Sequence, residues 1–453
     1  MCSPDDRIVD ERAGTAETSY AVHSFPTARR ATLRTRAPHA PRTGPARTTT
    51  GDGRHATPEA RAVTPAAPVR APHLYPVDLV RVVTFACVIA VHTISTTAPL
   101  DSVAAGGFVV LLHFTREAFF ALTAFVLTHR HRDEAPGPLR FWRRRFLLVG
   151  VPYVVWSAIY TGLGLSTAPL PVGAALRAFG HALLTGTAWY HLYFLLVSLQ
   201  FYLVFPLFRA LLRATRGHHL LVLAASAVLQ VVTDLWLHVP TPSPTEATVL
   251  PYATSLLVSY QFFVVFGGVV AMNLGAVDAW VRAHLPLVFV APLGTGAAVE
   301  LWYRHSVATG ATAQFAADVF QPVIIPWTVS VVAAVWGLGT LWADRRDRWR
   351  GSRFVEAAAA RSFGVFLVHP AILWLLATVP DAPAARLQRP WETVVTYVVT
   401  VVAALTFVEI VRRTPLRPAL TGKPRRSARP AVVVAGGRAG VAPIGVPGSR
   451  RSA

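Results

Sequence analysis

The chain has 453 residues, of which 53% are hydrophobic and only 15% are charged, well below the roughly 25% that is usual in soluble domains. Apolar runs of about 20 residues recur from position 77 to position 411, and each can cross about 30 Å of hydrocarbon, which excludes an ordinary soluble multidomain protein. The net charge of +20 lies mostly in the two tails and in short loops between apolar runs, so it indicates membrane orientation and excludes nucleic acid as the expected partner.

Both ends of the chain are basic and poor in apolar residues. Residues 1–74 are rich in Ala, Arg, Pro and Thr, and residues 414–453 are rich in Pro, Gly and Arg, so we expect two disordered cytoplasmic tails around a membrane domain of residues 75–413. The first tail lacks the apolar core of a secretory signal peptide. The two cysteines, Cys2 and Cys87, provide neither a disulfide framework nor a cysteine metal site, and we expect no metal.

The apolar runs predict an all-α integral membrane protein with about ten transmembrane helices. The segment 170–188 is also apolar, but prolines and glycines interrupt it, which favours an interfacial helix or a re-entrant segment over a further span. The ten expected spans are 76–98, 105–128, 146–166, 190–212, 218–238, 253–273, 280–301, 320–342, 358–379 and 392–412.

The distribution of basic residues predicts the orientation. With the N-terminus inside, the tails and internal loops hold 37 of the 43 Lys and Arg residues and the external loops hold four, while Arg81 and Arg116 lie within spans. Because cytoplasmic loops are enriched in Arg and Lys, this alternation predicts a multi-pass protein of the cell membrane with both termini in the cytoplasm. The basic segments are also expected to contact anionic lipid of the bilayer.

The first span carries three ionisable residues at helical spacing. Asp78 and Arg81 lie three positions apart on one helix face and can form a pair that stabilises their burial. His92 follows eleven residues after Arg81, on nearly the same face and about 16 Å further along the axis. Ionisable residues within spans usually face a cavity or a pathway, although Arg81 can equally be an interfacial anchor and His92 a packed polar residue.

This Asp-x-x-Arg and Arg-x10-His spacing resembles the first span of the membrane-bound acyltransferase family 3, which includes bacterial polysaccharide O-acetyltransferases and acylases of macrolide sugars. The resemblance covers residues 75–412. Thr123-Ala124 departs from the family's usual Ser-Gly, Leu148 replaces the second arginine of an Arg-x-x-Arg loop, and Leu79 replaces a common glycine. Four further segments match in order: Phe119-Phe120-Ala-Leu-Thr-Ala-Phe125, Phe141-Trp-Arg143-Arg144-Arg145-Phe with Pro152-Tyr153, Trp189-Tyr-His191-Leu-Tyr-Phe-Leu, and Ser362-Phe363-Gly364-Val-Phe-Leu-Val-His369-Pro370.

The resemblance implies transfer of an acyl group from acyl-CoA, with acetyl-CoA the expected donor, to a hydroxyl of a cell-surface glycan or a glycosylated metabolite. Transfer from a thioester to a hydroxyl requires a base near the acceptor, and neutral imidazole suits this role near pH 7, so His92 is the candidate base. The phosphates of coenzyme A require cations at the cytoplasmic side, and we expect Arg81, Arg143, Arg144 and Arg145 to bind them. Membrane orientation alone explains the three loop arginines equally well.

Three more residues are candidates for contact with the acceptor. His191 and Trp189 open the fourth span from its outer end, where aromatic rings suit the faces of sugars or form only an interfacial belt. His369 lies within a span next to Pro370, where a helix break could form a substrate cavity. His369 could instead be a hydrogen-bonding group between helices.

Arg116 and Glu117 are a second pair of charged residues within the membrane domain. Neighbours on a helix point about 100° apart, so each is expected to find a structural ion partner elsewhere in the bundle. Buried charges of this kind would also suit a multi-span transporter or exporter of a glycan, which is the main alternative to an enzyme. An exporter does not explain why arginines lie opposite a histidine along one helix face, and a membrane scaffold would need no buried ionisable residue.

Overall fold

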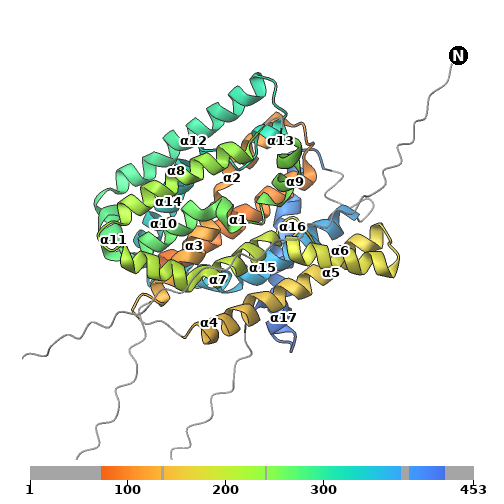
Figure 1. Ribbon diagram of the computed structural model, residues 1–453, viewed down its shortest axis with the longest axis horizontal. Helices are drawn as coiled ribbons and strands as arrows, with labels where there is room; N and C mark the ends of the chain where they lie inside the picture. Colours follow the sequence, from red (N-terminus) through yellow and green to blue (C-terminus); the bar gives the residue numbers. More distant parts are fainter. Residues whose placement is uncertain (1–72, 134–136, 240–241, 379–386, 424–453) are drawn as a thin grey trace, which may run out of the picture. The chain divides into compact units, whose positions relative to one another are not determined.

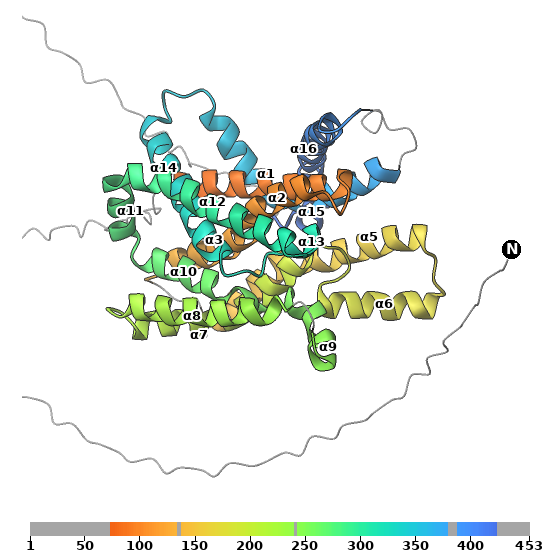
Figure 2. The ribbon, with the colours of Figure 1, turned by 90° about the horizontal axis from the view of Figure 1, so that it is seen from above.

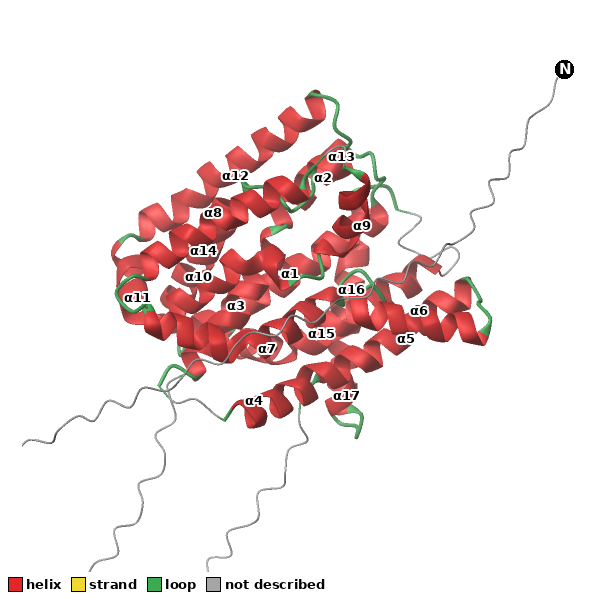
Figure 3. Cartoon of the chain, viewed as in Figure 1, coloured by secondary structure: helices red, strands yellow, loops and turns green. Residues whose placement is uncertain are grey.

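The computed structural model describes residues 73–133, 137–239, 242–378 and 387–423, and within them the chain forms helices and loops but no strand (Figures 1 and 3). This confirms the all-α membrane fold that the sequence predicts. The helices are α1 (Tyr75–Thr97), α2 (Val103–Leu112), α3 (Phe114–Arg130), α4 (Pro138–Arg145), the π-helix η1 (Phe146–Gly150), α5 (Val151–Thr167), α6 (Val172–Thr185), α7 (Tyr193–Ala214), α8 (His219–Leu237), α9 (Pro244–Ala253), the 3-10 helix η2 (Leu257–Tyr260), α10 (Gln261–Met272), α11 (Leu274–Ala283), α12 (Leu285–Ala308), α13 (Ala313–Ala316), α14 (Ile324–Arg345), α15 (Ser352–Thr378), α16 (Trp391–Val411) and α17 (Arg417–Thr421).

Within the described residues, nine helical segments are long and apolar enough to cross a membrane, and the bent pair of α9 with η2 and α10 makes a tenth if it is counted as one span. These ten segments coincide in order with the ten expected spans. The bent pair has an angle of 58° between its two halves. Gln200 of α7 holds this break, since its amide donates to the Ser255 carbonyl oxygen at 2.6 Å and accepts from the Leu257 backbone N–H at 2.9 Å.

Two of the spans are composite. α2 and α3 form one span of 28 residues that is interrupted at His113, and α4, η1 and α5 form one of 30 residues. α6 does not count as a span and lies antiparallel beside α5 (Figure 2), where Tyr153 Oη donates to the Leu183 carbonyl oxygen at 2.7 Å. This arrangement favours the re-entrant alternative for the segment 170–188.

α1 contacts α3, α14, α15 and α16, and so lies inside the bundle. Two glycines permit the closest helix contacts. A Cβ at Gly339 of α14 would lie 2.7 Å from the Cα of Pro76 in α1, and a Cβ at Gly267 of α10 would collide with the Ala121 carbonyl oxygen of α3. Both positions therefore require a residue without a side chain.

Aromatic side chains fill the space between α1, α3, α7 and α15. The ring of Phe85 in α1 lies 6.0 Å from that of Phe119 in α3 and 5.7 Å from that of Phe366 in α15. Phe119 also lies 5.4 Å from Phe194 of α7. Edge-to-face pairs contribute roughly 0.5–1.5 kcal/mol beyond the apolar area that they bury. This cluster holds the middle of α1 against three other helices.

The outermost helices expose apolar side chains. In α8, Leu220 and Leu221 are 80% and 67% exposed, and in α12, Leu293 and Leu301 are 72% and 68% exposed. Leucines exposed in series along a helix would be unfavourable in water, whereas lipid chains solvate them well. These two helices therefore form part of the lipid-facing surface.

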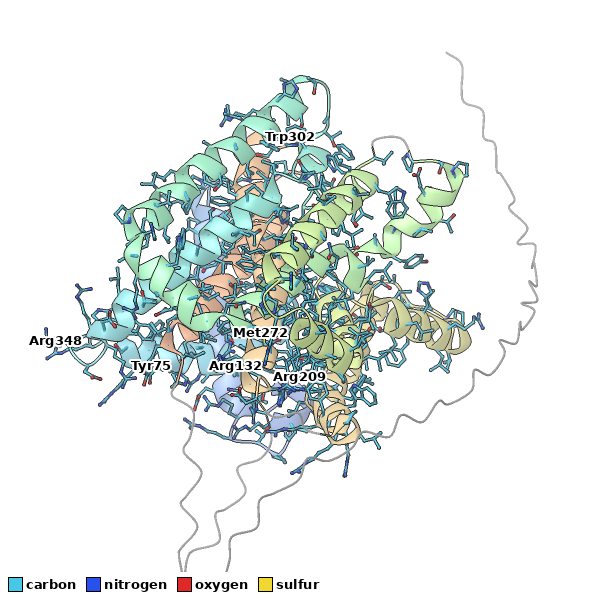
Figure 4. All side chains as sticks on the ribbon, turned by 60° about the vertical axis from the view of Figure 1, so that its left-hand side comes forward. Tyr75, Arg132, Arg209, Met272, Trp302 and Arg348 are labelled. Atoms are coloured by element: carbon cyan, nitrogen blue, oxygen red, sulfur yellow. The ribbon has the colours of Figure 1, made fainter. Side chains whose placement is uncertain are left out.

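Arginines gather at one end of the bundle, which we call the arginine-rich end. In Figure 4 the labelled Arg132, Arg209 and Arg348 lie toward the end at which Tyr75 begins α1, and Trp302 lies at the other end. The loops after α3, α7 and α14 all belong to the arginine-rich end, as the predicted alternation of loops requires.

The chain continues to pack after the last span. The sequence predicts a disordered tail from residue 414, but α17 packs against α5, α15 and α16, and Gly422 follows it in a left-handed conformation with φ of 62°. The packed domain therefore extends to Lys423. The remainder of the predicted tail, residues 424–453, and the predicted tail 1–74 up to residue 72 lie outside the described residues.

Candidate active site

A cavity of about 690 Å³ lies toward the end of the bundle opposite the arginine-rich end. The last turns of α1, the start of α2, the loop between α6 and α7, the break after α9, and α13 enclose it. The cavity reaches Leu100, which is 73% exposed, so it communicates with this surface. Its lining is rich in ionisable and aromatic side chains, which include His92, His113, Arg116, Trp189, Tyr190 and Asp318.

His92 projects from α1 into the lining of this cavity. Its ring lies 4.4 Å from that of Tyr190 and 5.4 Å from that of His369, measured between centroids. His92 is partly exposed, whereas His191 and His369 are both fully buried. Of these three histidines, His92 is therefore the one that a ligand in the cavity can reach.

His369 and Pro370 form a local structural unit in α15. Pro370 has no N–H, so the Phe366 carbonyl oxygen four residues earlier loses its usual helical partner. Nδ1 of His369 donates to this oxygen at 2.8 Å. Because a carbonyl oxygen can only accept, Nδ1 carries the proton, and the lone pair on Nε2 stays free. This Nε2 atom is buried and has no hydrogen-bond partner among the described residues.

Tyr160 of α5 stabilises the next position of the same helix. Its hydroxyl donates to the Leu367 carbonyl oxygen at 2.7 Å and accepts from the Ala371 N–H at 3.2 Å. α15 consequently runs without interruption from Ser352 to Thr378, and Pro370 does not open a cavity. The sequence predicts that His369 contacts the substrate in a cavity opened by Pro370. In the structure, His369 lies behind His92 and does not line the cavity.

His191 also lies behind the cavity wall. Its ring is 5.6 Å from that of His369 and 5.1 Å from that of Tyr160, and neither of its nitrogens has a hydrogen-bond partner in the described part of the chain. The sequence predicts contact between His191 and the acceptor, but His191 does not line the cavity. The neighbouring Trp189 does line the cavity. Its Nε1 atom is buried and has no hydrogen-bond partner among the described residues.

Arg116 and Glu117 pair with each other, contrary to the prediction that each finds a partner elsewhere. Arg116 Nε lies 3.4 Å from Glu117 Oε1. The two Cβ atoms point about 100° apart on the helix, but the arginine side chain is long enough to fold back to its neighbour. Arg116 also donates to the hydroxyl of Tyr193 at 3.2 Å, and its guanidinium lies 4.7 Å from the ring centroid of Phe320. The pair is structural in these contacts, but Arg116 also forms part of the cavity wall.

His113 and Asp318 line the cavity although no motif marks them, and Tyr190 lines it from within the Trp189-Tyr-His191 segment. His113 stands inside an apolar run, which is the same signal that identifies His92. Asp318 lies in the loop between α13 and α14, with Oδ2 3.4 Å from Nδ1 of His238. A residue in a loop gives no periodic signal, so its position in the cavity is known only from the fold.

A smaller pocket of about 340 Å³ lies at the arginine-rich end, lined by residues of α1 and α15 and the chain before α1. Asp78 Oδ1 lies 3.8 Å from Arg81 Nη1, which confirms the predicted pair, and Asp78 Oδ2 is closer still to Nε2 of His73 at 2.6 Å. Arg81 is 31% exposed in its side chain, so part of the guanidinium faces this pocket. Glu356 and Ala360 complete the opposite wall.

The three loop arginines belong to a different part of the arginine-rich end. Arg143 and Arg144 are exposed on α4, and the guanidinium of Arg145 lies 5.8 Å from the ring centroid of Tyr202 in α7. None of the three lines the Arg81 pocket. The predicted single donor site is thus divided, with Arg81 in a pocket and the α4 arginines on the nearby surface.

The face of α1 that joins Arg81 to His92 is closed by packing. Phe85 and Val88 lie on this face between the two residues and are 7% and 6% exposed, and Val88 is itself part of the wall of the 690 Å³ cavity. The residues that line the 690 Å³ cavity and those that line the Arg81 pocket do not overlap. The helix therefore presents Asp78 and Arg81 to one compartment and His92 to the other.

Sequence comparison places these features in a known group. Comparisons with curated proteins and with solved structures find no match. The family model described as an acyltransferase domain matches residues 74–409, which is well over half of the chain and runs from the start of α1 into the last turn of α16. With this match, and with nine candidate spans in the described part of the chain, or ten if the bent pair is one span, the chain belongs to the membrane-bound acyltransferase family 3.

Proposed function

We propose that this membrane acyltransferase moves an acyl group, with acetyl the expected group, from acyl-CoA to a hydroxyl of a cell-surface glycan or a glycosylated metabolite. The observation that carries the proposal is the arrangement of α1. His92 faces a ligand-sized cavity, and Arg81, on the same helix face, lines a separate pocket at the arginine-rich end of the bundle. This arrangement fits a reaction whose two substrates approach from opposite sides of a membrane.

The cavity suits a sugar as acceptor. A volume of 690 Å³ falls within the roughly 300–1,000 Å³ typical of small-molecule sites and can hold one or two sugar rings. Trp189 and Tyr190 offer aromatic faces to the apolar faces of sugar rings, and Arg116, His113 and Asp318 offer donors and acceptors for hydroxyl groups. We therefore assign the acceptor to this cavity.

The donor is assigned to the arginine-rich end. The positive-inside rule makes this end cytoplasmic, which is the side on which acyl-CoA is present, and the protein is then a multi-pass protein of the cell membrane with both termini in the cytoplasm. Arg81 is suited to a phosphate of coenzyme A. The pantetheine arm would extend along α1 for about 16 Å, the rise of eleven helical residues, to bring its thioester to His92. Phe85 and Val88 must move aside for this to occur.

The chemical step requires one base. Neutral His92 accepts the proton of the acceptor hydroxyl as its oxygen attacks the thioester carbonyl carbon. The tetrahedral intermediate then expels the thiolate of coenzyme A, which takes the proton from the imidazolium. An ester and free CoA–SH are the products, and His92 is regenerated. The free lone pair on Nε2 of His369 gives the imidazolium a nearby polar group during this cycle.

Purified full-length protein in lipid nanodiscs tests the proposal. With [14C]acetyl-CoA and a mixture of glycoside acceptors, we expect label to pass to a glycoside hydroxyl and CoA–SH to appear in equal amount. An exporter, the alternative function, would instead move labelled glycan across vesicle membranes without breaking any thioester. Glycan movement without release of CoA–SH would replace the proposed function with that alternative.

A further inference from the structure

The only lysine of the chain, Lys423, contacts one wall of the Arg81 pocket without being among the residues that line it. Its Nζ donates to the carbonyl oxygen of Ala360, and Ala360 lines the pocket beside Arg81. Lys423 follows α17 and Gly422, in a stretch that the sequence alone assigns to a disordered tail. The fold thus returns the segment that follows α16 to the neighbourhood of the first turns of α1.

Specific contacts hold this segment in place. Trp156 of α5, which is 2% exposed, donates through Nε1 to the Leu420 carbonyl oxygen at 3.1 Å. A Cβ at Gly422 would lie 2.6 Å from the Leu148 carbonyl oxygen and 2.7 Å from the ring of Phe363, and the residue has φ of 62°. Only glycine meets both conditions, so the segment turns at one defined point and carries Lys423 against α15.

Four arginines lie near Lys423, and the carboxylates of this region, Asp78, Glu356 and Glu409, already pair with other cations. Arg361 uses its guanidinium on Glu409, with Nη2 2.6 Å and Nε 3.0 Å from Oε2, and Asp78 is already bonded to His73. Nε of Arg417, in contrast, is buried with no hydrogen-bond partner among the described residues. Burial, followed by repulsion from nearby arginines, lowers the pKa of Lys423 to about 8; these arginines are Arg412, Arg81, Arg417 and Arg361. Such a concentration of cations with an unsatisfied donor is suited to a ligand with several negative charges.

We propose that Lys423 and Arg417 complete, together with Arg81, a binding site for the phosphate groups of the acyl donor. This assignment rests on the proposed function, because it takes acyl-CoA as the ligand of the arginine-rich end. Coenzyme A carries a pyrophosphate and a 3′-phosphate, which can bind several cations at once. The segment after the last span then acts as part of the donor site, and the exposed arginines of α4 are peripheral to it.

An anionic lipid headgroup offers the same phosphate chemistry, so the test compares the two sources. Full-length protein is placed in nanodiscs of phosphatidylcholine, and an amine-reactive succinimidyl ester is added at pH 8. Peptide mass spectrometry then reports modification of Lys423 alone, because no other lysine exists. Desulfo-CoA, which has no reactive thiol, is expected to slow this modification at least several-fold. Protection by phosphatidylglycerol in the nanodisc, with none by desulfo-CoA, would overturn the assignment to the donor.

Binding measurements with variants complete the test. We expect Lys423→Gln and Arg417→Gln each to weaken desulfo-CoA binding about tenfold, the effect of losing one charged hydrogen bond. Lys423→Arg should retain affinity, which shows that the segment still folds. Arg348→Gln is the matched control, since it removes one charge from an exposed loop at the same end of the bundle. If the wild type binds desulfo-CoA and neither Lys423→Gln nor Arg417→Gln weakens that binding, this assignment is overturned and the proposed donor stands. If the wild type does not bind desulfo-CoA, the proposed donor is overturned as well.

Discussion

The rings of His92 and His369 stack with 5.4 Å between their centroids and 28° between their planes. Of these two rings, that of His92 lines the cavity, and His369 is fixed by its Nδ1 hydrogen bond to the Phe366 carbonyl oxygen. The free Nε2 of His369 is therefore held at a constant position beside the proposed base. We infer that His369 is a positioning residue for His92, in addition to satisfying the helix at Pro370.

Two substitutions separate these roles of His369. Asparagine places an amide N–H where Nδ1 stands, so His369→Asn should keep the hydrogen bond to Phe366 and unfold near the wild-type temperature. His369→Ala should lower the free energy of unfolding by about 1–3 kcal/mol, because it leaves a buried carbonyl unsatisfied. His369→Asn should still reduce kcat roughly tenfold to a hundredfold with KM values unchanged, since it lacks Nε2. Wild-type kcat in His369→Asn would leave His369 a purely structural role.

Phe85 controls the proposed path between the two compartments. Its ring packs against Phe119 and Phe366 on the face of α1 that joins Arg81 to His92. Phe85→Trp adds bulk at this point and should reduce acyl transfer strongly while leaving the affinity for desulfo-CoA phosphates unchanged. Phe85→Leu should remain active, because the smaller side chain leaves the path open. Equal transfer rates in the two variants, measured with [14C]acetyl-CoA, would show that the thioester does not pass Phe85.

The membrane orientation can be measured by thiol labelling. In a variant with Cys2 and Cys87 replaced by serine, cysteines at Ala308 and Gln388 should react with an impermeant maleimide added to intact cells. Cysteines at Gly137 and Asp347 should react only after permeabilisation, because these exposed residues lie in the arginine-rich loops. The opposite labelling pattern would place the Arg81 pocket outside the cell, where acyl-CoA is not present.

The lowered pKa of Lys423 predicts a pH dependence of donor binding. Its folded value of about 8 lies below the usual 10.5, because of burial and of repulsion by Arg412, Arg81, Arg417 and Arg361. A bound phosphate stabilises the ammonium form, so the affinity for desulfo-CoA should be constant below about pH 8 and fall as the pH rises above it.

Isothermal titration at several pH values between 7 and 9.5 measures this dependence. Lys423→Arg keeps its charge over the whole range and should show no decline, and Lys423→Gln should show a low and constant affinity. A decline that persists in Lys423→Arg would mean that another group is responsible.

Much of the fold could be predicted because hydrophobic length and loop charge are local properties. The ten spans and the shared face of Asp78, Arg81 and His92 follow from residues close together in the sequence. The bridge between Leu367 and Ala371 on either side of Pro370 could not be predicted, since it depends on Tyr160, which is more than 200 positions away. The packing of α17 also escaped prediction, because five residues carry no hydrophobic period.

The candidate site likewise has features that the sequence predicts and features that only the fold reveals. A histidine inside an apolar run marks His92, and the same signal marks His369, but periodicity cannot say which of them faces a cavity. That distinction depends on the loop before α7, which places Tyr190 against His92 and buries His191 behind it. Helix geometry alone predicts that Arg116 and Glu117 point apart. The flexibility of the arginine side chain brings the two charged groups together.

Single-turnover transfer from [14C]acetyl-CoA by His92 variants tests the central claim most directly. His92→Ala and His92→Gln should both insert and fold normally, since neither adds a charge to the first span, and both should bind desulfo-CoA like the wild type. The account predicts that both lose transfer by roughly a hundredfold to ten-thousandfold, because neither side chain can take up a proton near pH 7. Transfer within a few-fold of wild type in both variants would contradict the account, because no general base would then act at His92.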